Sequence, residues 1–294
     1  MLEIAKVNRS FGDHHVLKDV SFTVQPGRLT GFVGSNGAGK TTTMRIALGV
    51  LSADSGTVLL NGAPVGTHDR RRFGYMPEER GLYPKMRVAE QLVYLARLHG
   101  LSAQEAQRNA SALLERLELT ERAGDDVETL SLGNQQRAQI AAALVHDPEI
   151  LVLDEPFSGL DPIAVDVVLG VLKERANAGA PVLFSSHQLD IVERLCDDLV
   201  IIADGAIRTA GPTEQLRREH SLPRYEMLLG GDAGWVREVA DVTVLELDGD
   251  YAVFETATDA TAQQVLRLAI ERGHVASFGP HQPSLAHIFR EIIK

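Results

Sequence analysis

The residues whose types and spacing suggest chemistry lie in one segment near the N-terminus, residues 33–43, which reads V-G-S-N-G-A-G-K-T-T-T. The segment fits the phosphate-binding pattern G-x-x-x-x-G-K-[ST], and it lies between an apolar run at 29–33 and a helix predicted at 42–51. Glycines let the backbone wrap closely around a phosphate chain, and a helix N-terminus adds a partial positive charge. The segment therefore predicts a site that binds a chain of phosphates.

The side chains of this loop have separate expected roles. Lys40 would reach the outer phosphates, and the hydroxyl of Thr41 would bind Mg²⁺. The residues that we expect to contact the phosphate ligand are Gly34, Ser35, Asn36, Gly37, Ala38, Gly39, Lys40, Thr41 and Thr42.

A second apolar run, 150–153, ends in Asp154 and Glu155. An aspartate at the end of such a strand can hold Mg²⁺, and the adjacent glutamate can polarise a water molecule. A further apolar run at 181–184 leads to His187. These residues predict a metal ligand at Asp154 and a water-activating group at Glu155.

Ser131 and Gly133 mark a second candidate anion site. Ser131 stands at an N-cap position ahead of a helix predicted at 137–145, and Gly133 lies beside it. A serine hydroxyl, a small residue and free helix N–H groups can together bind an anion. An ordinary capped helix has the same pattern, and on its own this segment favours that interpretation.

Composition restricts the class of protein. The chain has 294 residues, of which 44% are hydrophobic, enough for a large core. Its 40 acidic and 29 basic side chains give a net charge of −11, so we expect no binding to nucleic acid through phosphate contacts. The single cysteine, Cys196, excludes an internal disulfide and suits a reducing cytosol. We find no run of about 18 apolar residues and expect no membrane span.

The pattern of apolar residues changes along the chain. Strands are predicted before and after the phosphate loop, whereas residues 88–99 and 102–119 have helical spacing. From about residue 222 the pattern becomes that of a small α+β module. Its predicted elements are strands at 225–229, 242–247, 251–255 and 274–278 and helices at 261–272 and 284–293.

Taken together in this order, the motifs resemble those of the nucleotide-binding subunit of the ATP-binding cassette (ABC) family, over residues 1–220. The resemblance implies an α/β P-loop NTPase cassette with a mixed-sheet core, an antiparallel β subdomain and a helical subdomain at about 85–145. Residues 221–294 then form a C-terminal α+β accessory domain, which more loosely resembles the extension of subunits that partner exporter-type permeases. The implied cofactors are ATP and Mg²⁺.

The resemblance also assigns roles to single residues. Glu155 becomes the general base, and His187 contacts the γ-phosphate. Phe11 becomes the aromatic residue that stacks on adenine, whereas the sequence without the resemblance favours packing of this phenylalanine in the core. The signature residues Ser131 and Gly133, with Asp161, would act on the ATP of a second subunit.

Two departures from the family pattern stand out. The signature usually reads L-S-G-G-Q, whereas here residues 130–134 read L-S-L-G-N. Glu78 occupies the position of a glutamine that normally approaches the γ-phosphate. A carboxylate there can bind Mg²⁺ or water, but it also repels the phosphate.

The function that the resemblance implies is an ATPase subunit at the cytoplasmic face of the membrane. Its expected partners are a separate membrane permease, docked near residues 72–98, and a second ATP-binding subunit in a homodimer, with ATP held between the two. Export is the expected direction of transport. The alternative is an ABC ATPase that drives a membrane or soluble partner mechanically without transport.

Overall fold

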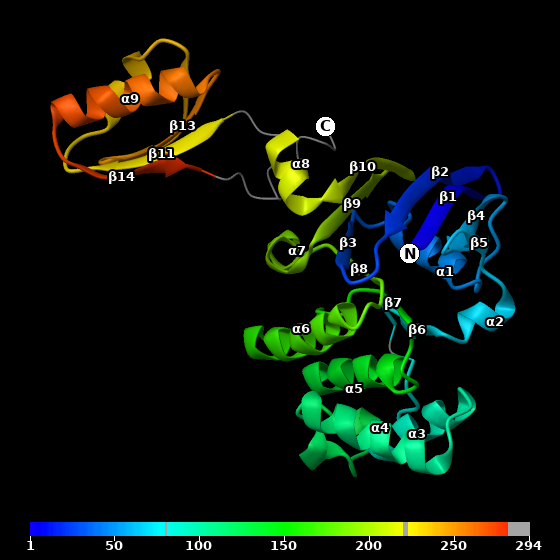
Figure 1. The fold of residues 1–294 in the computed structure, drawn as a ribbon. Helices are drawn as coiled ribbons and strands as arrows, with labels where there is room; N and C mark the ends of the chain where they lie inside the picture. The colour runs from blue at the N-terminus through cyan, green and yellow to red at the C-terminus, as the bar shows by residue number, and fades with distance from the viewer. Residues whose placement is uncertain (80, 220–222, 282–294) are drawn as a thin grey trace. The chain divides into compact units, whose positions relative to one another are not determined.

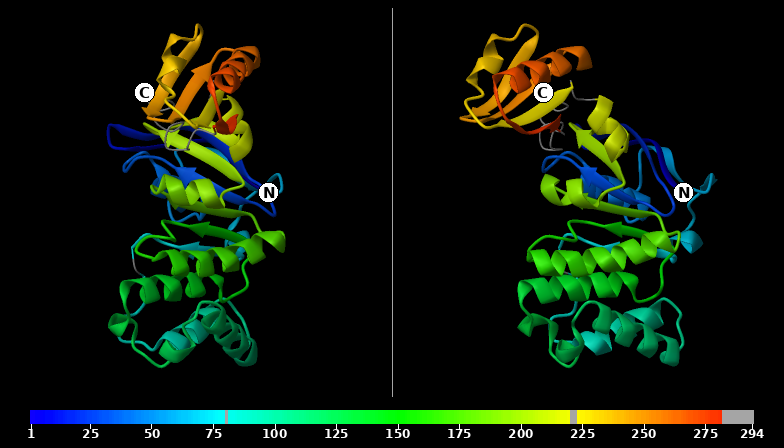
Figure 2. Two further views of the ribbon diagram at one scale, coloured as in Figure 1. Left: turned by 90° about the vertical axis from the view of Figure 1, so that its left-hand side faces the viewer. Right: turned by 60° about the vertical axis from the view of Figure 1, so that its left-hand side comes forward.

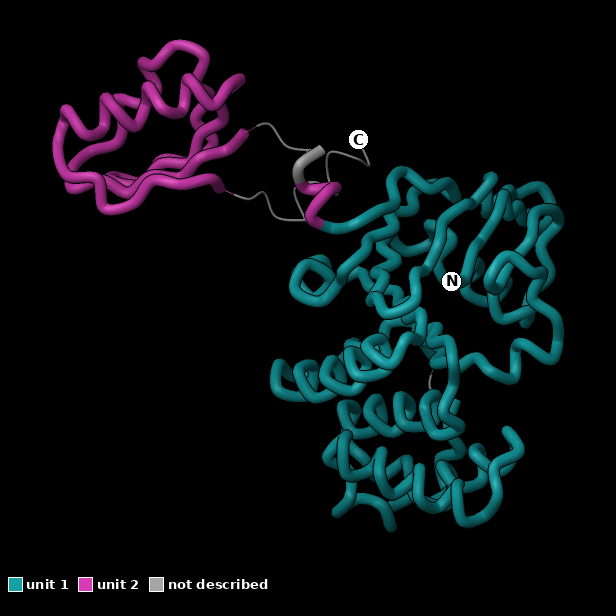
Figure 3. The backbone as a smooth tube through the Cα atoms, viewed as in Figure 1, with its two compact units in different colours: residues 1–213 teal, residues 214–294 magenta. Residues whose placement is uncertain are grey.

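The computed structural model describes residues 1–79, 81–219 and 223–281. The chain divides into two compact units, Met1–Thr213 and Glu214–Lys294 (Figure 3). The division falls slightly before the boundary that we predicted at residue 220. No helix among the described residues is both long and apolar enough to cross a membrane.

The centre of the first unit is a six-stranded sheet with the strand order β10-β9-β3-β8-β7-β6 (Figure 1). The strands from β9 to β6 are parallel, and β10 is antiparallel to β9. Because parallel strands end at the same edge, the segments that follow them meet there. The strands are β3 (Leu29–Val33), β6 (Phe73–Met76), β7 (Ile150–Leu153), β8 (Val182–Ser186), β9 (Asp198–Ala203) and β10 (Ala206–Pro212).

A second, antiparallel sheet in this unit has the order β2-β1-β4-β5. Its strands are β1 (Leu2–Phe11), β2 (His14–Val24), β4 (Ser55–Leu60) and β5 (Ala63–Pro64). The two sheets share one apolar core, in which Met44 of α1 (Lys40–Ala47) is fully buried. Phe22 and Phe32 join the sheets, with ring centroids 5.1 Å apart. The helix that follows the phosphate loop is thus anchored from both sides.

The chain between β6 and β7 is helical (Figure 2). Helices α3 and α4 pack on each other, and α5 contacts both of them as well as β6. Ser102 begins α4 with the predicted capping box, since its hydroxyl accepts from the Glu105 N–H and the Glu105 carboxylate accepts from the Ser102 N–H. These elements are α3 (Val88–Leu98), α4 (Ala103–Arg116), η1 (Thr120–Arg122), η2 (Val127–Thr129) and α5 (Leu132–Leu144). The other helices of the unit are α2 (Thr67–Arg70), α6 (Pro162–Asn177) and α7 (Leu189–Leu195).

The second unit begins within α8 (Thr213–Glu219) and contains an antiparallel sheet of order β12-β13-β11-β14. Helix α9 packs on β13 and β14, and Val265 and Ala269 of that helix join the apolar core of the unit. The elements are β11 (Arg224–Leu229), η3 (Gly234–Glu238), β12 (Val242–Asp248), β13 (Tyr251–Thr256), α9 (Asp259–Arg272) and β14 (Val275–Pro280).

Some element boundaries differ from those predicted. Helix α5 begins at Leu132, directly after its cap Ser131, and not at residue 137. The Ser131 cap starts the helix at this point, and Gln136 holds its first turns through hydrogen bonds to the carbonyls of Glu155 and Pro156. Helix α1 ends at Ala47 and not at residue 51. The helix predicted at 284–293 lies outside the described residues.

Gly74 in β6 allows α5 to approach the sheet closely. A Cβ added there would lie 2.3 Å from the backbone oxygen of Ala143 and 2.7 Å from Cδ2 of Leu151. We expect Gly74→Ala to lower the free energy of unfolding by about 1–3 kcal/mol, because backbone atoms must shift to admit the methyl group. Urea unfolding would measure this change. The control is Gly170→Ala in α6, where nothing lies within 4 Å of the added carbon and where alanine should stabilise the helix by about 1 kcal/mol. An unchanged midpoint for Gly74→Ala would contradict the close packing.

Candidate functional site

The phosphate loop connects β3, at the middle of the six-stranded sheet, to α1. All five residues of β3 are buried, so the loop begins from a fixed position. Gly39 has φ +108°, and a Cβ there would lie 2.5 Å from Cδ2 of Leu17. Only glycine fits this position, which turns the chain into α1 with its N-terminal N–H groups free of side-chain caps. Ser35 and Ala38 close the turn itself through a bond from the Ala38 N–H to the Ser35 carbonyl, 3.1 Å.

The side chain of Lys40 is bound to the backbone of the phosphate loop. Its buried Nζ donates to the carbonyl oxygens of Gly34 and Ser35, at 2.6 and 3.2 Å. Burial lowers the pKa of Lys40, while the nearby carboxylates of Glu155, Asp154 and Glu78 act in the opposite direction. The ammonium group is thus already positioned against the loop, where a phosphate would replace carbonyl oxygens as its partners.

Asp154 links three segments that are distant in sequence. One oxygen of its carboxylate accepts from the Thr41 hydroxyl at 2.8 Å, and the other accepts from the hydroxyl of Ser185. Both Asp154 and Ser185 are buried. Because Leu153 pairs with Phe184 in the sheet, the next residues along the two strands are neighbours. The sequence-predicted metal ligands Thr41 and Asp154 are therefore adjacent.

The next residue, Glu155, is paired with His187. The Nδ1 atom of His187 lies 2.9 Å from Oε1 of Glu155. Glu155 has φ +51°, a value that is uncommon outside glycine, and its N–H donates to the Ser185 hydroxyl at 2.9 Å. Gln136 Nε2 donates to the Glu155 carbonyl at 2.9 Å. Two hydrogen bonds therefore hold an unusual backbone conformation that fixes the position of the carboxylate.

Four of these residues, Lys40, Thr41, Asp154 and Glu155, line one cavity of about 490 Å³. Glu78 from the segment after β6 and Phe11 from the end of β1 also reach it. Phe11 is 49% exposed, with the Arg9 guanidinium 4.8 Å above its ring, so it is not a core residue. The full lining is Phe11, His14, Val16, Asn36, Gly37, Gly39, Lys40, Thr41, Thr42, Glu78, Asp154 and Glu155.

Seven sequence-predicted site residues do not line this cavity: Gly34, Ser35 and Ala38 of the phosphate loop, His187, which pairs with Glu155, and Ser131, Gly133 and Asp161 at the starts of two other helices. Ser131 caps α5 by accepting from the Asn134 N–H, and Asp161 caps α6 by accepting from the Ala164 N–H at 2.8 Å. Gly133 lies in the first turn of α5. Ser131 and Asp161 are exposed, so they remain available to another molecule.

The sequence interpretation missed three residues that organise the site. Ser185 holds both Asp154 and the Glu155 N–H. Gln136 donates a hydrogen bond to the Glu155 carbonyl, in the segment after β7. Gln139 Nε2 donates to the carbonyl of Pro77 at 2.6 Å, and Pro77 is adjacent to Glu78 in the chain. Pairing the predicted strands β7 and β8 would have placed Ser185 beside Asp154. The two glutamines left no pattern in the sequence, because they donate to backbone carbonyls, which every residue has.

The cavity can accept a divalent cation together with phosphates. Thr41 and Asp154 supply hard oxygen ligands, which suit Mg²⁺, a cation that takes one or two protein oxygens and completes its shell with phosphate and water. Within the described ranges, no three metal-ligating side chains gather at one point. The residues present therefore fit a Mg²⁺ ion that arrives with a nucleotide.

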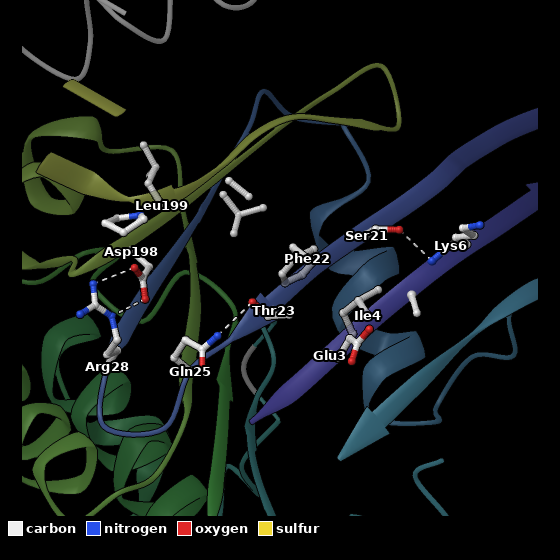
Figure 4. A pocket seen from close by; sticks show the side chains of 15 residues that line it. Glu3, Ile4, Lys6, Ser21, Phe22, Thr23, Gln25, Arg28, Asp198 and Leu199 are labelled. Carbon is white, nitrogen blue, oxygen red and sulfur yellow. Dashed lines mark hydrogen bonds and ion pairs between the residues drawn. The ribbon is translucent and has the colours of Figure 1, made fainter. Parts of the chain in front are cut away.

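A larger cavity, about 690 Å³, lies elsewhere in the first unit (Figure 4). It lies between residues of β1 and β2 and residues of β9 and β10. Arg28 at one end is already bound in a bidentate pair to Asp198, at 2.6 and 2.7 Å. This cavity shares no residue with the phosphate loop, and we do not assign it to the nucleotide.

Comparisons with known proteins agree with this geometry. Residues 17–158 match the family described as ABC transporter, and residues 211–293 match the C-terminal domain of DrrA1-3-like ATP-binding proteins. The ABC transporter ATP-binding protein YhaQ of Bacillus subtilis (strain 168) is 37% identical over 99% of this chain and 98% of its own length. The Nod factor export ATP-binding protein I of Burkholderia lata is 41% identical over 69% of this chain and 68% of its own length.

Solved structures agree as well. An ATP-binding subunit of an ABC transporter superposes with a TM-score of 0.69 and 33% identity, covering 74% of this chain and 92% of that one. A dimeric bacterial ABC transporter cassette shares the fold, with a TM-score of 0.66 and 22% identity over 72% of this chain and 98% of its own. The phosphate loop, the Asp154–Glu155 pair and a relative that matches almost the whole length lead to one conclusion: the chain belongs to the family of ABC transporter ATP-binding proteins.

Proposed function

We propose that this protein hydrolyses ATP and powers a separate membrane permease. The observation that supports this most directly is the cavity in which Lys40, Asp154 and Glu155 meet. Its loop suits a triphosphate, its oxygen ligands suit Mg²⁺, and its Glu155–His187 pair suits activation of a water molecule.

In the proposed reaction, the oxygen of a water molecule attacks the γ-phosphorus of ATP, and the bond to the β-phosphate oxygen breaks. Glu155 accepts the proton that the water loses, and His187 positions that carboxylate and the γ-phosphate. Lys40 and the N–H groups at the start of α1 stabilise the negative charge on the phosphates. A bound Mg²⁺, held by Thr41 and Asp154, would neutralise further phosphate charge.

We propose a homodimer as the working form. Ser131, Gly133 and Asp161 lie outside the cavity that contains the phosphate loop, so they would contact ATP bound to another subunit. Phe11 would stack on the adenine. ATP would then join two copies, and loss of the γ-phosphate would loosen them.

The proposed docking surface for the permease lies on the helical part of the first unit. Tyr83, Tyr94 and Leu98 are exposed, and the two tyrosine rings pack edge to face at 6.4 Å. Next to them is a cavity of about 300 Å³, whose lining includes Leu95 and His99. Exposed aromatic residues beside an apolar cavity are typical of protein interfaces. This surface overlaps the expected coupling region at 72–98.

We further propose a location at the cytoplasmic face of the membrane and a role in export. The name of the Nod factor export relative supports this direction of transport. The decisive experiment combines the protein with its candidate permease in vesicles and measures ATP-dependent movement of substrate. Substrate flux that depends on Glu155 would support export. ATP hydrolysis stimulated by the permease without any flux would favour the alternative, a mechanical role without transport.

The carboxylate of Glu78 leads to a prediction about the binding of ATP and Mg²⁺. It lines the cavity and is exposed, and its negative charge acts against the lowering of the Lys40 pKa that burial causes. Removing its charge in Glu78→Gln should strengthen binding of ATP without Mg²⁺ about fivefold, because roughly 1 kcal/mol of repulsion is lost. The same change should raise the Mg²⁺ concentration needed for half-maximal hydrolysis. Calorimetric titration and a Mg²⁺ dependence of the rate would measure both effects.

The matched control for that experiment is Glu79→Gln. Glu79 is the adjacent exposed carboxylate, and it does not line the cavity. Equal effects at both positions would show that Glu78 acts only through the general surface charge.

A further inference from the structure

The ring of Phe11 is held on one face by a pair of charged side chains. The Arg9 guanidinium lies 4.8 Å from the ring centroid, because side chains two residues apart in a strand lie on the same face. Arg9 in turn donates to one carboxylate oxygen of Asp54 at 2.7 Å. Phe11 lines the nucleotide cavity, whereas Arg9 and Asp54 do not. The two charged residues would therefore act on a bound base through Phe11 and not by direct contact.

The position of Asp54 is fixed at three points. One carboxylate oxygen accepts from Nη1 of Arg9 and the other accepts from the Ser10 N–H, both at 2.7 Å. The N–H of Asp54 itself donates to the carbonyl of Asn8 at 2.9 Å. An exposed ion pair on its own contributes little to stability. This pair also bonds the backbone directly before Phe11, so it restricts where the guanidinium can lie relative to the ring.

Phe11 needs such support because of its place and its chemistry. It is 49% exposed at the end of β1, opposite His14 across the turn to β2. A phenylalanine has no hydroxyl group, so no hydrogen bond can fix its ring. A cation above one face holds the ring and leaves the rest of it open toward the cavity. A base that stacks on a ring already held in place binds at a smaller cost in conformational freedom.

We infer that Arg9 and Asp54 are positioning residues, which orient the ring of Phe11 for stacking on the adenine of ATP. This role rests on the proposed binding of ATP and adds two residues that do not touch the nucleotide. A purely electrostatic role would act on the phosphates, whatever base they carry. Because Arg9 and Asp54 have opposite charges, their loss would then shift the affinity in opposite directions. Positioning through Phe11 predicts instead that either loss weakens the binding of ATP.

The test compares the binding of ATP and of inorganic triphosphate to the full chain, by calorimetric titration without Mg²⁺. Arg9→Gln and Asp54→Asn should each raise the dissociation constant of ATP about threefold to fivefold, because the contact between the cation and the ring is lost or loosened. Both variants should bind inorganic triphosphate within about twofold of the parent. In steady-state hydrolysis with Mg²⁺, KM for ATP should rise while kcat is retained, because the base is bound alike in the ground state and the transition state.

Two further variants complete the test. Phe11→Ala should raise the dissociation constant of ATP about tenfold, since the stack itself is lost. Adding Arg9→Gln to Phe11→Ala should then change the constant less than twofold, because no ring remains to be positioned. The matched control is Arg122→Gln, which removes an arginine paired with Asp125 outside the cavity. This control should bind ATP as the parent does.

The outcomes separate the role of the ion pair from the function on which it rests. A parent protein that does not bind ATP would overturn both. Weaker ATP binding by Phe11→Ala, with unchanged binding by Arg9→Gln and Asp54→Asn, would overturn the positioning role alone. Opposite shifts by these two variants, or equal weakening for ATP and inorganic triphosphate, would also overturn it, because the pair would then act by charge. Thermal unfolding checks the fold of each variant, and substitutions at two separate residues keep the test valid if one variant does not fold.

Discussion

Replacing Glu155 with glutamine should lower steady-state ATP hydrolysis by about a hundredfold to ten-thousandfold, the usual contribution of a general base. The amide has nearly the same size as the carboxylate and can still accept the bond from His187, but it cannot take a proton from water. ATP affinity should change only a few-fold, since Lys40 and the loop remain in place. A phosphate-release assay and ATP titration would measure the two quantities.

The matched control is Glu115→Gln, an exposed carboxylate on α4 that does not line the cavity. It should hydrolyse ATP at the parent rate. Hydrolysis by Glu155→Gln within a few-fold of the parent would remove Glu155 from the proposed reaction. The positive φ of Glu155 makes the position sensitive to larger changes, so the isosteric glutamine tests the chemistry better than alanine does.

Replacing Lys40 with alanine should weaken ATP binding roughly a hundredfold. The ammonium group is buried and would exchange its bonds to Gly34 and Ser35 for bonds to phosphate oxygens. Its removal takes away the one cationic side chain that lines the cavity, while three carboxylates there still repel the phosphates. A loss of about 3 kcal/mol is the upper part of the range for a hydrogen bond to a charged group. Equilibrium binding of a fluorescent ATP analogue would measure the change.

Lys40→Ala also removes two hydrogen bonds within the loop, so its fold must be checked by thermal unfolding. Lys173→Ala, at an exposed lysine of α6, is the control for loss of one positive charge. It should bind ATP as the parent does. Unchanged affinity in a folded Lys40→Ala protein would contradict the role that we give to the phosphate loop.

The sequence was most informative where local geometry fixes the chemistry. Gly39 has φ +108°, a backbone conformation that residues other than glycine rarely adopt, and the turn itself sets this conformation. Residues 150–153 had to be a buried strand because all four are apolar, and β7 is fully buried. Such positions depend on their neighbours along the chain, so they can be recognised without knowledge of the fold. The helix boundary at Leu132 was missed because the start of α5 is held by hydrogen bonds from Gln136 to the carbonyls of Glu155 and Pro156, which are distant in sequence.

The sequence by itself determined that the chain has a phosphate loop, that an aspartate and a glutamate follow a buried strand, and that the C-terminal part changes character. Only the tertiary structure decided how these parts meet. Pairing of β7 with β8 brings Ser185 to Asp154, and the order of the sheet brings Thr41 within 2.8 Å of the same carboxylate. The tertiary structure also places Ser131 and Gly133 outside the nucleotide cavity of their own chain. The physical reason is that strand order and register are set by packing of the whole core, whereas a loop conformation is set by the few residues that form it.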